Sequence, residues 1–109
     1  MFGSPIGKID IAEEFQSDMQ RLEHLGSLRE VLGCSDVRIF SYFNAGNRPM
    51  DEWRGETVRR MRELGEKAQA LGLTLYHENE RHIFGDLGER VEILVSELTE
   101  GLPYKFIFD

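Results

Sequence analysis

Apolar residues recur three or four positions apart in three stretches of the chain, and a glycine follows each stretch. This spacing places the apolar side chains on one face of a helix, and it predicts helices over about 11–32, 51–71 and 87–99. A glycine just past a helix is typical of a left-handed C-terminal cap. The apolar stripe of the first helix consists of Phe15, Met19, Leu22, Leu25, Leu28 and Leu32. The capping glycines are Gly33, Gly72 and Gly101.

A short apolar run follows each capping glycine and predicts strands over 37–43, 73–78 and 104–109. Helices and strands that alternate in units of about 30 to 40 residues are typical of βα crossover units, in which helices cover a parallel sheet. The segment from Gly3 to Lys8 has the composition of a loop. No Gly-rich phosphate-binding motif follows a strand, which disfavours the common nucleotide-binding α/β folds. The sequence therefore predicts an α/β fold with parallel strands.

Three parallel strands alone would leave two apolar edges unpaired. A closed (β/α)8 TIM barrel has eight strands and typically about 250 residues. We therefore expect residues 1–109 to be the central segment of a single larger barrel, with about three consecutive αβ units and with N- and C-terminal parts missing. The alternative is a small open α/β domain that is complete in itself.

The chain of 109 residues carries a formal charge of −7, contains one cysteine and has no apolar run near the length of a membrane span. Its densest basic group, Arg59, Arg60 and Arg62, alternates with glutamates at helical spacing. We interpret this group as a solvated, ion-paired helix face rather than a nucleic-acid patch. These features predict no nucleic-acid partner and no membrane association. A single cysteine fits a reducing compartment, so a cytoplasmic location is expected.

Polar residues appear where two of the predicted strands end. Glu78 ends the strand over 73–78 and is followed by Asn79 and Glu80, and Asp109 ends the next strand. Because functional residues of β/α barrels gather at the carboxyl ends of strands, Glu78 and Asp109 are candidate ligands of one divalent cation. Asn79 and Glu80 are placed to bind a polyhydroxylated substrate. Solvated loop residues are an equally good interpretation of the two acids. Lys8 either meets a phosphate or carboxylate or is an ordinary surface lysine.

Two further residues have a structural interpretation. His77 should point away from Glu78 because strand neighbours face opposite sides, so we interpret it as a packed histidine. The string from His77 to Arg81 is not an HExxH zinc motif, because Arg81 holds the fifth position. Trp53 is either a core anchor or a sugar-stacking lid, and the anchor is favoured.

The sequence resembles the sugar phosphate isomerase/epimerase family of the xylose isomerase-like TIM barrels. The similarity spans essentially the whole chain and keeps the order of the motifs. Its most specific part is Glu78-Asn79-Glu80, followed by a Gly-Asp turn and a strand that ends in Asp. The phrases that carry the resemblance are residues 4–8 (SPIGK), 37–43 (VRIFSYF), 77–80 (HENE), 84–86 (FGD) and 106–109 (FIFD).

The resemblance implies a role for each candidate residue. Glu78 resembles the first of four ligands (Glu, Asp, His, Glu) of a divalent metal ion such as Mn, Mg, Co or Zn, and Asp109 resembles the second. Glu80 resembles a substrate-contacting acid. In the implied reaction the metal polarises a sugar or sugar phosphate, and carboxylates, Glu78 among them, move a proton through an enediolate. The remaining His and Glu lie on later strands, so this chain alone is expected to be inactive.

Three alternatives to the isomerase or epimerase remain open. A dehydratase of the same superfamily, acting on a sugar or inositol derivative, would have similar strand-end ligands. A noncatalytic chain that only binds or assembles is the second alternative. A nuclease resembling endonuclease IV is disfavoured by the acidic charge and by Ser41-Tyr42-Phe43, where such an enzyme would be expected to show histidine.

We predict that the isolated chain self-associates through its open sheet edges or folds poorly, because its edges and apolar faces lack their partners. Analytical ultracentrifugation and urea unfolding measure this directly. A monomer with one sharp cooperative unfolding transition would contradict the expectation that the chain is a barrel segment.

Overall fold

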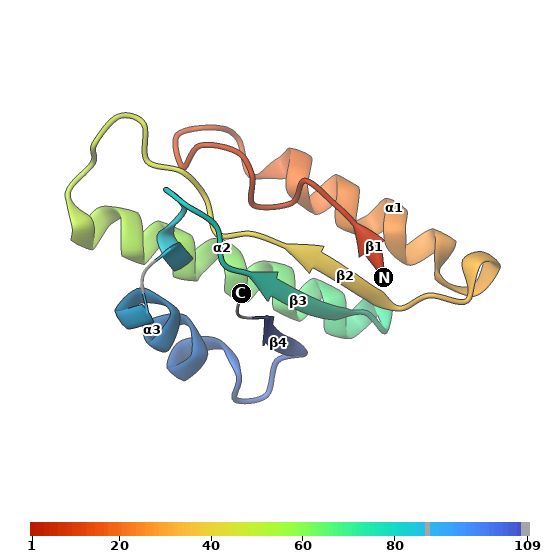
Figure 1. The fold of residues 1–109 in the computed structure, drawn as a ribbon. Coiled ribbons are helices and arrows are strands. Elements are labelled where there is room, and N and C mark those ends of the chain that lie inside the picture. Colours follow the sequence, from red (N-terminus) through yellow and green to blue (C-terminus); the bar gives the residue numbers. More distant parts are fainter. Residues whose placement is uncertain (87, 108–109) are drawn as a thin grey trace.

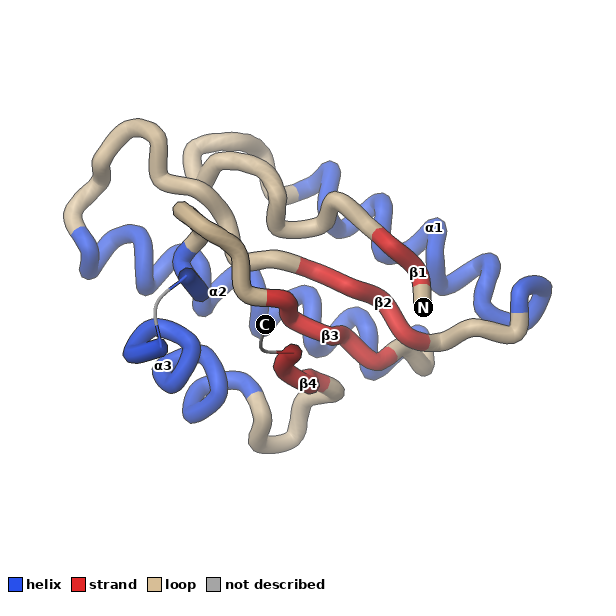
Figure 2. Tube along the Cα trace, in the orientation of Figure 1, coloured by secondary structure: helices blue, strands red, loops and turns tan. Residues whose placement is uncertain are grey.

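A computed structural model describes residues 1–86 and 88–107 of the chain. Four parallel strands form one sheet in the order β1-β2-β3-β4, and helices alternate with them (Figures 1 and 2). The parallel α/β architecture predicted from the sequence is confirmed. The elements are β1 (Phe2–Gly3), α1 (Gln16–Leu32), β2 (Asp36–Ile39), α2 (Met50–Leu71), β3 (Thr74–Glu78), the 3-10 turn η1 (Phe84–Asp86), α3 (Gly88–Leu98) and β4 (Tyr104–Ile107).

The amino-terminal region differs from the prediction in two respects. Phe2 and Gly3 form a strand that pairs with Val37 and Arg38, so the sheet has a fourth strand that the pattern did not reveal. Two residues are too few to show a periodicity, and only pairing with β2 defines this strand. The first helix begins at Gln16 rather than near residue 11, because the preceding residues bond to the segment after β2.

The segment 40–43, predicted as the end of a strand, instead runs beside residues 6–9. Phe40 N–H donates to Ile6 O at 2.8 Å, and Tyr42 N–H donates to Gly7 O at 2.8 Å. Strand β2 therefore ends at Ile39. These bonds tie the loops that follow β1 and β2 to each other at the carboxyl end of the sheet.

Strand register divides the sheet into two different faces. Val37 pairs with Leu75 and Leu75 with Tyr104, and all three are buried in the core with helix residues such as Leu22, Met61 and Leu94. Every second position points to the opposite face, which we call the open face. It is defined by Arg38, Tyr76, Glu78 and Lys105, none of which is buried in the core.

Helix α1 buries less of its predicted stripe than expected. Leu22 is fully buried, but Leu32 is 59% exposed. The reason is the position of α2: a Cβ on Gly26 would lie 2.9 Å from Leu71, the last residue of α2. The final turn of α1 therefore extends past the end of α2, and its last apolar residues, Val31 and Leu32, stay exposed.

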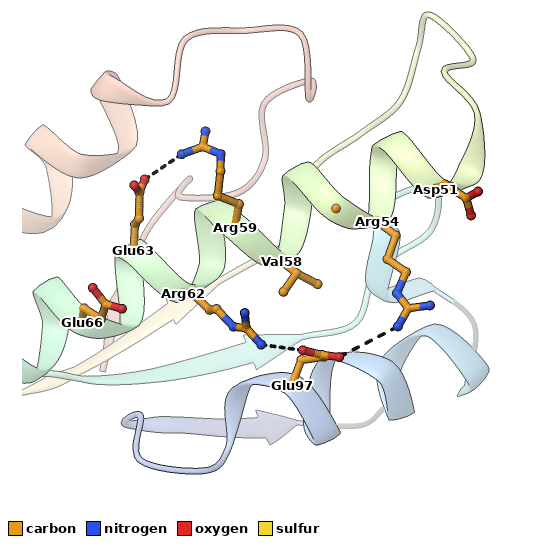
Figure 3. A pocket seen from close by; sticks show the side chains of 9 residues that line it. Asp51, Arg54, Val58, Arg59, Arg62, Glu63, Glu66 and Glu97 are labelled. Carbon is orange, nitrogen blue, oxygen red and sulfur yellow. Dashed lines mark hydrogen bonds and ion pairs between the residues drawn. The ribbon is translucent and has the colours of Figure 1, made fainter.

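The basic group on α2 is mostly, though not entirely, an ion-paired surface. Arg59 pairs with Glu63 at 3.0 Å, and Arg62 reaches Glu97 of α3 at 2.5 Å (Figure 3). Arg60 was wrongly grouped with them, because it is only 6% exposed. No helix in the described part of the chain is both long and apolar enough to cross a membrane.

A buried polar cluster joins β3 to the segments after β2 and β3. The hydroxyl of Ser41 lies 2.9 Å from Nε2 of His77 and accepts the N–H of Gly85 at 2.8 Å. All three residues are buried. His77 is thus a packed histidine, as its strand position predicted. The cluster holds η1 against the carboxyl ends of β2 and β3.

We predict that Gly85→Ala destabilises the protein by about 1–3 kcal/mol, because overpacking a buried site forces its neighbours to move. The new Cβ would lie 2.5 Å from the His77 ring and 2.8 Å from Ser41 Oγ. The matched control is Gly55→Ala on α2, where the new Cβ would have open space around it. There alanine should stabilise by about 0.5–1 kcal/mol. Urea unfolding midpoints compare the two, and equal shifts would refute the packing argument.

Candidate functional site

Glu78 lies at the carboxyl end of β3 and faces the open side of the sheet. Its Oε2 is 3.6 Å from Nε of Arg38 on the neighbouring strand, a distance suited to an ion pair but too long for a hydrogen bond. The side chain of Glu78 is 26% exposed. Its carboxylate is therefore oriented by Arg38 without being locked by a hydrogen bond.

Lys8 and Glu80 form a second ion pair beside the first. Lys8 Nζ is 3.1 Å from Glu80 Oε1, and it also lies 4.6 Å above the centre of the Phe40 ring. The guanidinium of Arg38 lies 5.5 Å from the centre of the same ring. Phe40 thus links the two ion pairs. Of the residues predicted from the sequence, Lys8 and Glu80 are in direct contact, and Glu78 is connected to them through Arg38 and the Phe40 ring.

The remaining candidates are less well placed. Asn79 lies between the two acids and is half-buried. Asp109 lies outside the described residues, so its predicted role as a ligand stays a prediction. The register pairs Glu78 with Ile107, two positions before Asp109 in the sequence.

The β1–α1 loop, which carries Lys8, is held by a buried carboxylate on α1. Asp18 is fully buried, and its Oδ2 accepts the N–H of Gly7 at 3.1 Å and the hydroxyl of Tyr42 at 2.8 Å. Burial, followed by the nearby charge of Asp18, raises the pKa of Tyr42 well above its ordinary value. Gly7 has a φ of 82°, and a Cβ there would lie 2.0 Å from the Phe40 carbonyl oxygen. Only glycine fits this position, directly before Lys8.

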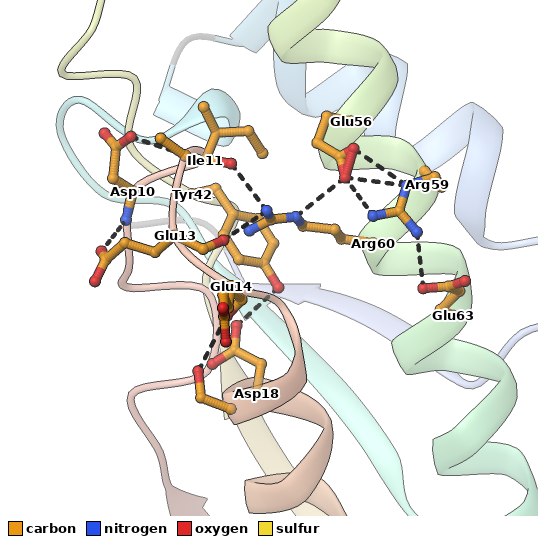
Figure 4. A network of polar contacts seen from close by, with 12 residues as sticks. Asp10, Ile11, Glu13, Glu14, Asp18, Tyr42, Glu56, Arg59, Arg60 and Glu63 are labelled. Atoms are coloured by element: carbon orange, nitrogen blue, oxygen red, sulfur yellow. Dashed lines mark hydrogen bonds and ion pairs between the residues drawn. The ribbon is translucent and has the colours of Figure 1, made fainter.

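Arg60 of α2 supports the same loop from the helix side. Its Nη2 donates to the carbonyl oxygens of Ile11 at 2.8 Å and Glu13 at 2.7 Å (Figure 4). Its guanidinium lies 5.0 Å from the centre of the Tyr42 ring and pairs with Glu56 at 3.3 Å. The loop is thus anchored to both α1 and α2, which fixes where Lys8 emerges.

The open face offers carboxylate oxygens, the donors that Mg²⁺ and Mn²⁺ prefer. Within residues 1–86 and 88–107, no group of three or more His, Cys, Asp or Glu side chains could hold a metal ion. Glu78 is the better placed of the two acids, because Glu80 is already in close contact with Lys8. The donor chemistry fits a hard divalent cation, while the described residues supply only part of a ligand set.

Arg38 is a site residue that the sequence reasoning missed. It stands in β2 between the buried residues Val37 and Ile39, and a charged residue there must face away from the helices. That alternation was the signal that could have identified it. Trp53, in contrast, was correctly favoured as a core anchor, because it is 6% exposed and packs edge-on against Phe84.

Comparisons with known proteins support the fold but not a family. No family model matches the chain, and no curated protein matches it. A crystal structure of the probable 3-DHS dehydratase AsbF of Bacillus anthracis, involved in petrobactin synthesis, superimposes with a TM-score of 0.80 at 18% identity. The superposition covers 98% of this chain but only 38% of the AsbF chain.

A second solved structure is a xylose isomerase-like TIM barrel/4-hydroxyphenylpyruvate dioxygenase fusion protein, with a TM-score of 0.66 and 23% identity. The superposition covers 90% of this chain and 16% of the fusion protein. The four parallel strands with alternating helices are therefore part of a TIM barrel, as the sequence predicted. The open face is the side that faces the interior in such a barrel.

We predict that His77 makes stability fall as the pH drops from 7 to 5. Burial lowers its pKa to about 4 from an ordinary value of 6.5. In this range the unfolded chain binds a proton that the folded chain excludes, so folding becomes less favourable as pH falls. The stability contribution of neutral His77 is fully present at neutral pH and disappears as the pH falls toward 4. The expected loss between pH 7 and pH 5 is roughly 2 kcal/mol.

Urea unfolding at pH 7 and pH 5 measures this loss. His77→Gln should remove that part of the pH dependence, whereas His24→Gln on the exposed surface of α1 should keep it. The same pH dependence in all three proteins would show that His77 is not the responsible group.

Proposed function

We propose that this chain is the central segment of a barrel enzyme that moves a proton next to a carbonyl group of a sugar or sugar phosphate, as an isomerase or epimerase does. The observation that carries the proposal is the grouping of Glu78, Glu80 and Lys8 at the carboxyl ends of the strands on the open face. Catalytic residues of TIM barrels gather at this end of the sheet.

In this proposal Glu78 accepts the proton from the carbon beside the carbonyl group. Its carboxylate has no hydrogen bond to Arg38 to break, and Arg38 keeps it oriented at 3.6 Å. A carboxylate within hydrogen-bond reach of its proton is a standard general base. Arg38 acts here as a positioning residue.

Lys8 and Glu80 bind the polar end of the substrate. Their exposed fractions, 41% and 38%, leave both side chains accessible from the barrel mouth. A substrate hydroxyl can donate to Glu80, and a phosphate or hydroxyl oxygen can accept from Lys8. Asn79, between Glu78 and Glu80, adds an amide that suits a polyhydroxylated substrate.

The proposed cofactor is a divalent cation such as Mg²⁺ or Mn²⁺, held by Glu78 and, beyond the described residues, by Asp109. A bound cation would supply Lewis-acid polarisation of the carbonyl oxygen. The proposal also requires further ligands that residues 1–86 and 88–107 do not contain.

A dehydratase is the second candidate, favoured by the fold similarity to the probable 3-DHS dehydratase AsbF. The first step is the same: Glu78 takes the proton from the carbon beside the carbonyl group. In a dehydratase the resulting electron pair forms a C=C bond, and the C–O bond at the neighbouring carbon breaks to release hydroxide, which is protonated to water. An isomerase or epimerase instead returns the proton to carbon and keeps every hydroxyl group.

Proton exchange tests the shared step. The protein that carries this chain, supplied with Mn²⁺ and hydroxylated aldehydes, ketones or their phosphates, should incorporate deuterium from D2O beside the carbonyl. Glu78→Gln should lower the rate by about 10²–10⁴, the usual contribution of a general base. The matched control is Glu66→Gln on the exposed face of α2, which should retain full activity.

Thermal unfolding of both variants checks that each has folded. Mass and NMR analysis of the product separates the two candidate reactions, because loss of water identifies a dehydratase. A folded Glu78→Gln variant with undiminished exchange would refute the role of Glu78.

A further inference from the structure

One row of side chains crosses the open face from strand to strand. The register aligns Gly3, Arg38, Tyr76 and Lys105 on β1, β2, β3 and β4 (Figure 1). This row contains two cations and no acid. A Cβ on Gly3 would lie 3.5 Å from Nη2 of Arg38, so the guanidinium lies beside β1. The four strands therefore present a basic surface at this level.

Lys105 is the cation of this row that lacks a carboxylate partner. Arg38 has a counterion in Glu78, at 3.6 Å. Lys105 forms no ion pair with a carboxylate of residues 1–86 and 88–107, and its side chain is exposed on the open face. Its ammonium lies 5.8 Å from the centre of the Tyr76 ring. An aromatic ring attracts a cation but does not neutralise its charge.

The fold places this charge in the interior of a barrel. The superposition on AsbF covers only 38% of that chain, so most of that protein lies outside the matched segment. The interior of a TIM barrel is packed with side chains rather than open to water. An ammonium in such an interior is stable only when it is paired. Because the carbonyl groups of parallel strands already accept ladder hydrogen bonds, a carboxylate side chain is the group suited to neutralise Lys105.

We propose that a strand of the barrel outside this chain presents an Asp or Glu side chain to Lys105, so that the two parts of the barrel meet through an interior ion pair. The partner that fits the open face at this level is therefore a barrel strand with an acid on its interior side. The inference rests on the register and on the barrel fold, and it is independent of the reaction proposed for Glu78.

Zero-length cross-linking identifies the counterion directly. A carbodiimide joins a lysine amine to a carboxylate in contact with it, with loss of water, and peptide mass spectrometry identifies both residues. In the protein that carries this chain, Lys105 should be linked to an Asp or Glu outside residues 1–109. The internal controls are two exposed ion pairs of the chain, Lys8–Glu80 at 3.1 Å and Lys67–Glu23 at 2.9 Å.

Substitutions in the same protein give a second readout. Lys105→Met leaves the proposed acid buried and unpaired, so it should lower the melting temperature by at least about 5 °C. Lys105→Arg keeps the charge and should lower it less. The matched control, Lys67→Met on α2, removes only an exposed ion pair and should have less than half the effect of Lys105→Met.

Four results would overturn the proposal. The first two are cross-links of Lys105 only to an acid of this chain, or to a second copy of it. The third is a rise in melting temperature with inorganic phosphate that Lys105→Met abolishes, because the counterion would then be an anionic ligand. The fourth is an unlinked Lys105 together with a folded Lys105→Met variant that melts no lower than Lys67→Met. If Lys105→Met does not fold, the cross-link in the unaltered protein decides.

Discussion

The parallel register of β2, β3 and β4 is the constraint on which the rest of the structure depends. It places Val37, Leu75 and Tyr104 side by side under the helices, and Arg38, Tyr76 and Lys105 side by side on the open face. A slip of one residue would exchange these sets, burying charges under the helices and exposing the core. The same register brings Glu78 to the open face and turns His77 toward the opposite face, where it is buried. The register of these strands therefore determines both the buried core and the position of the candidate site.

Buried polar groups then fix the loops that extend from the sheet. Asp18 draws together Gly7 and Tyr42, and Ser41 joins His77 to Gly85. Both clusters lie at the carboxyl end of the sheet and connect segments distant in sequence. These buried hydrogen bonds hold the segments that carry Lys8 and Glu80 in place. The ion pair between Lys8 and Glu80 is itself exposed and contributes little to stability.

The sequence predicted regular elements well because periodicity is a local signal. Helices α2 and α3 and strand β3 follow their predicted ranges within about one residue. Lys8 contacts Glu80, and Glu78 contacts Arg38 beside them, while the roles predicted for these residues stay predictions. The two-residue β1 and the late start of α1 could not be predicted, since both depend on pairing between residues 2–11 and 37–43. Arg60 was misjudged because the carbonyl groups that bury it, those of Ile11 and Glu13, are tens of residues away. Arg38 was missed although the alternation of the strand marked it.

Our proposal depends most on Glu78, at the end of β3, as a ligand of a divalent cation. Anomalous X-ray scattering from crystals of the protein grown with Mn²⁺ tests this most directly. We expect an anomalous peak within about 2.0–2.6 Å of a carboxylate oxygen of Glu78. A peak only at the exposed glutamates of the helices, or no peak at the carboxyl ends of the strands, would contradict it.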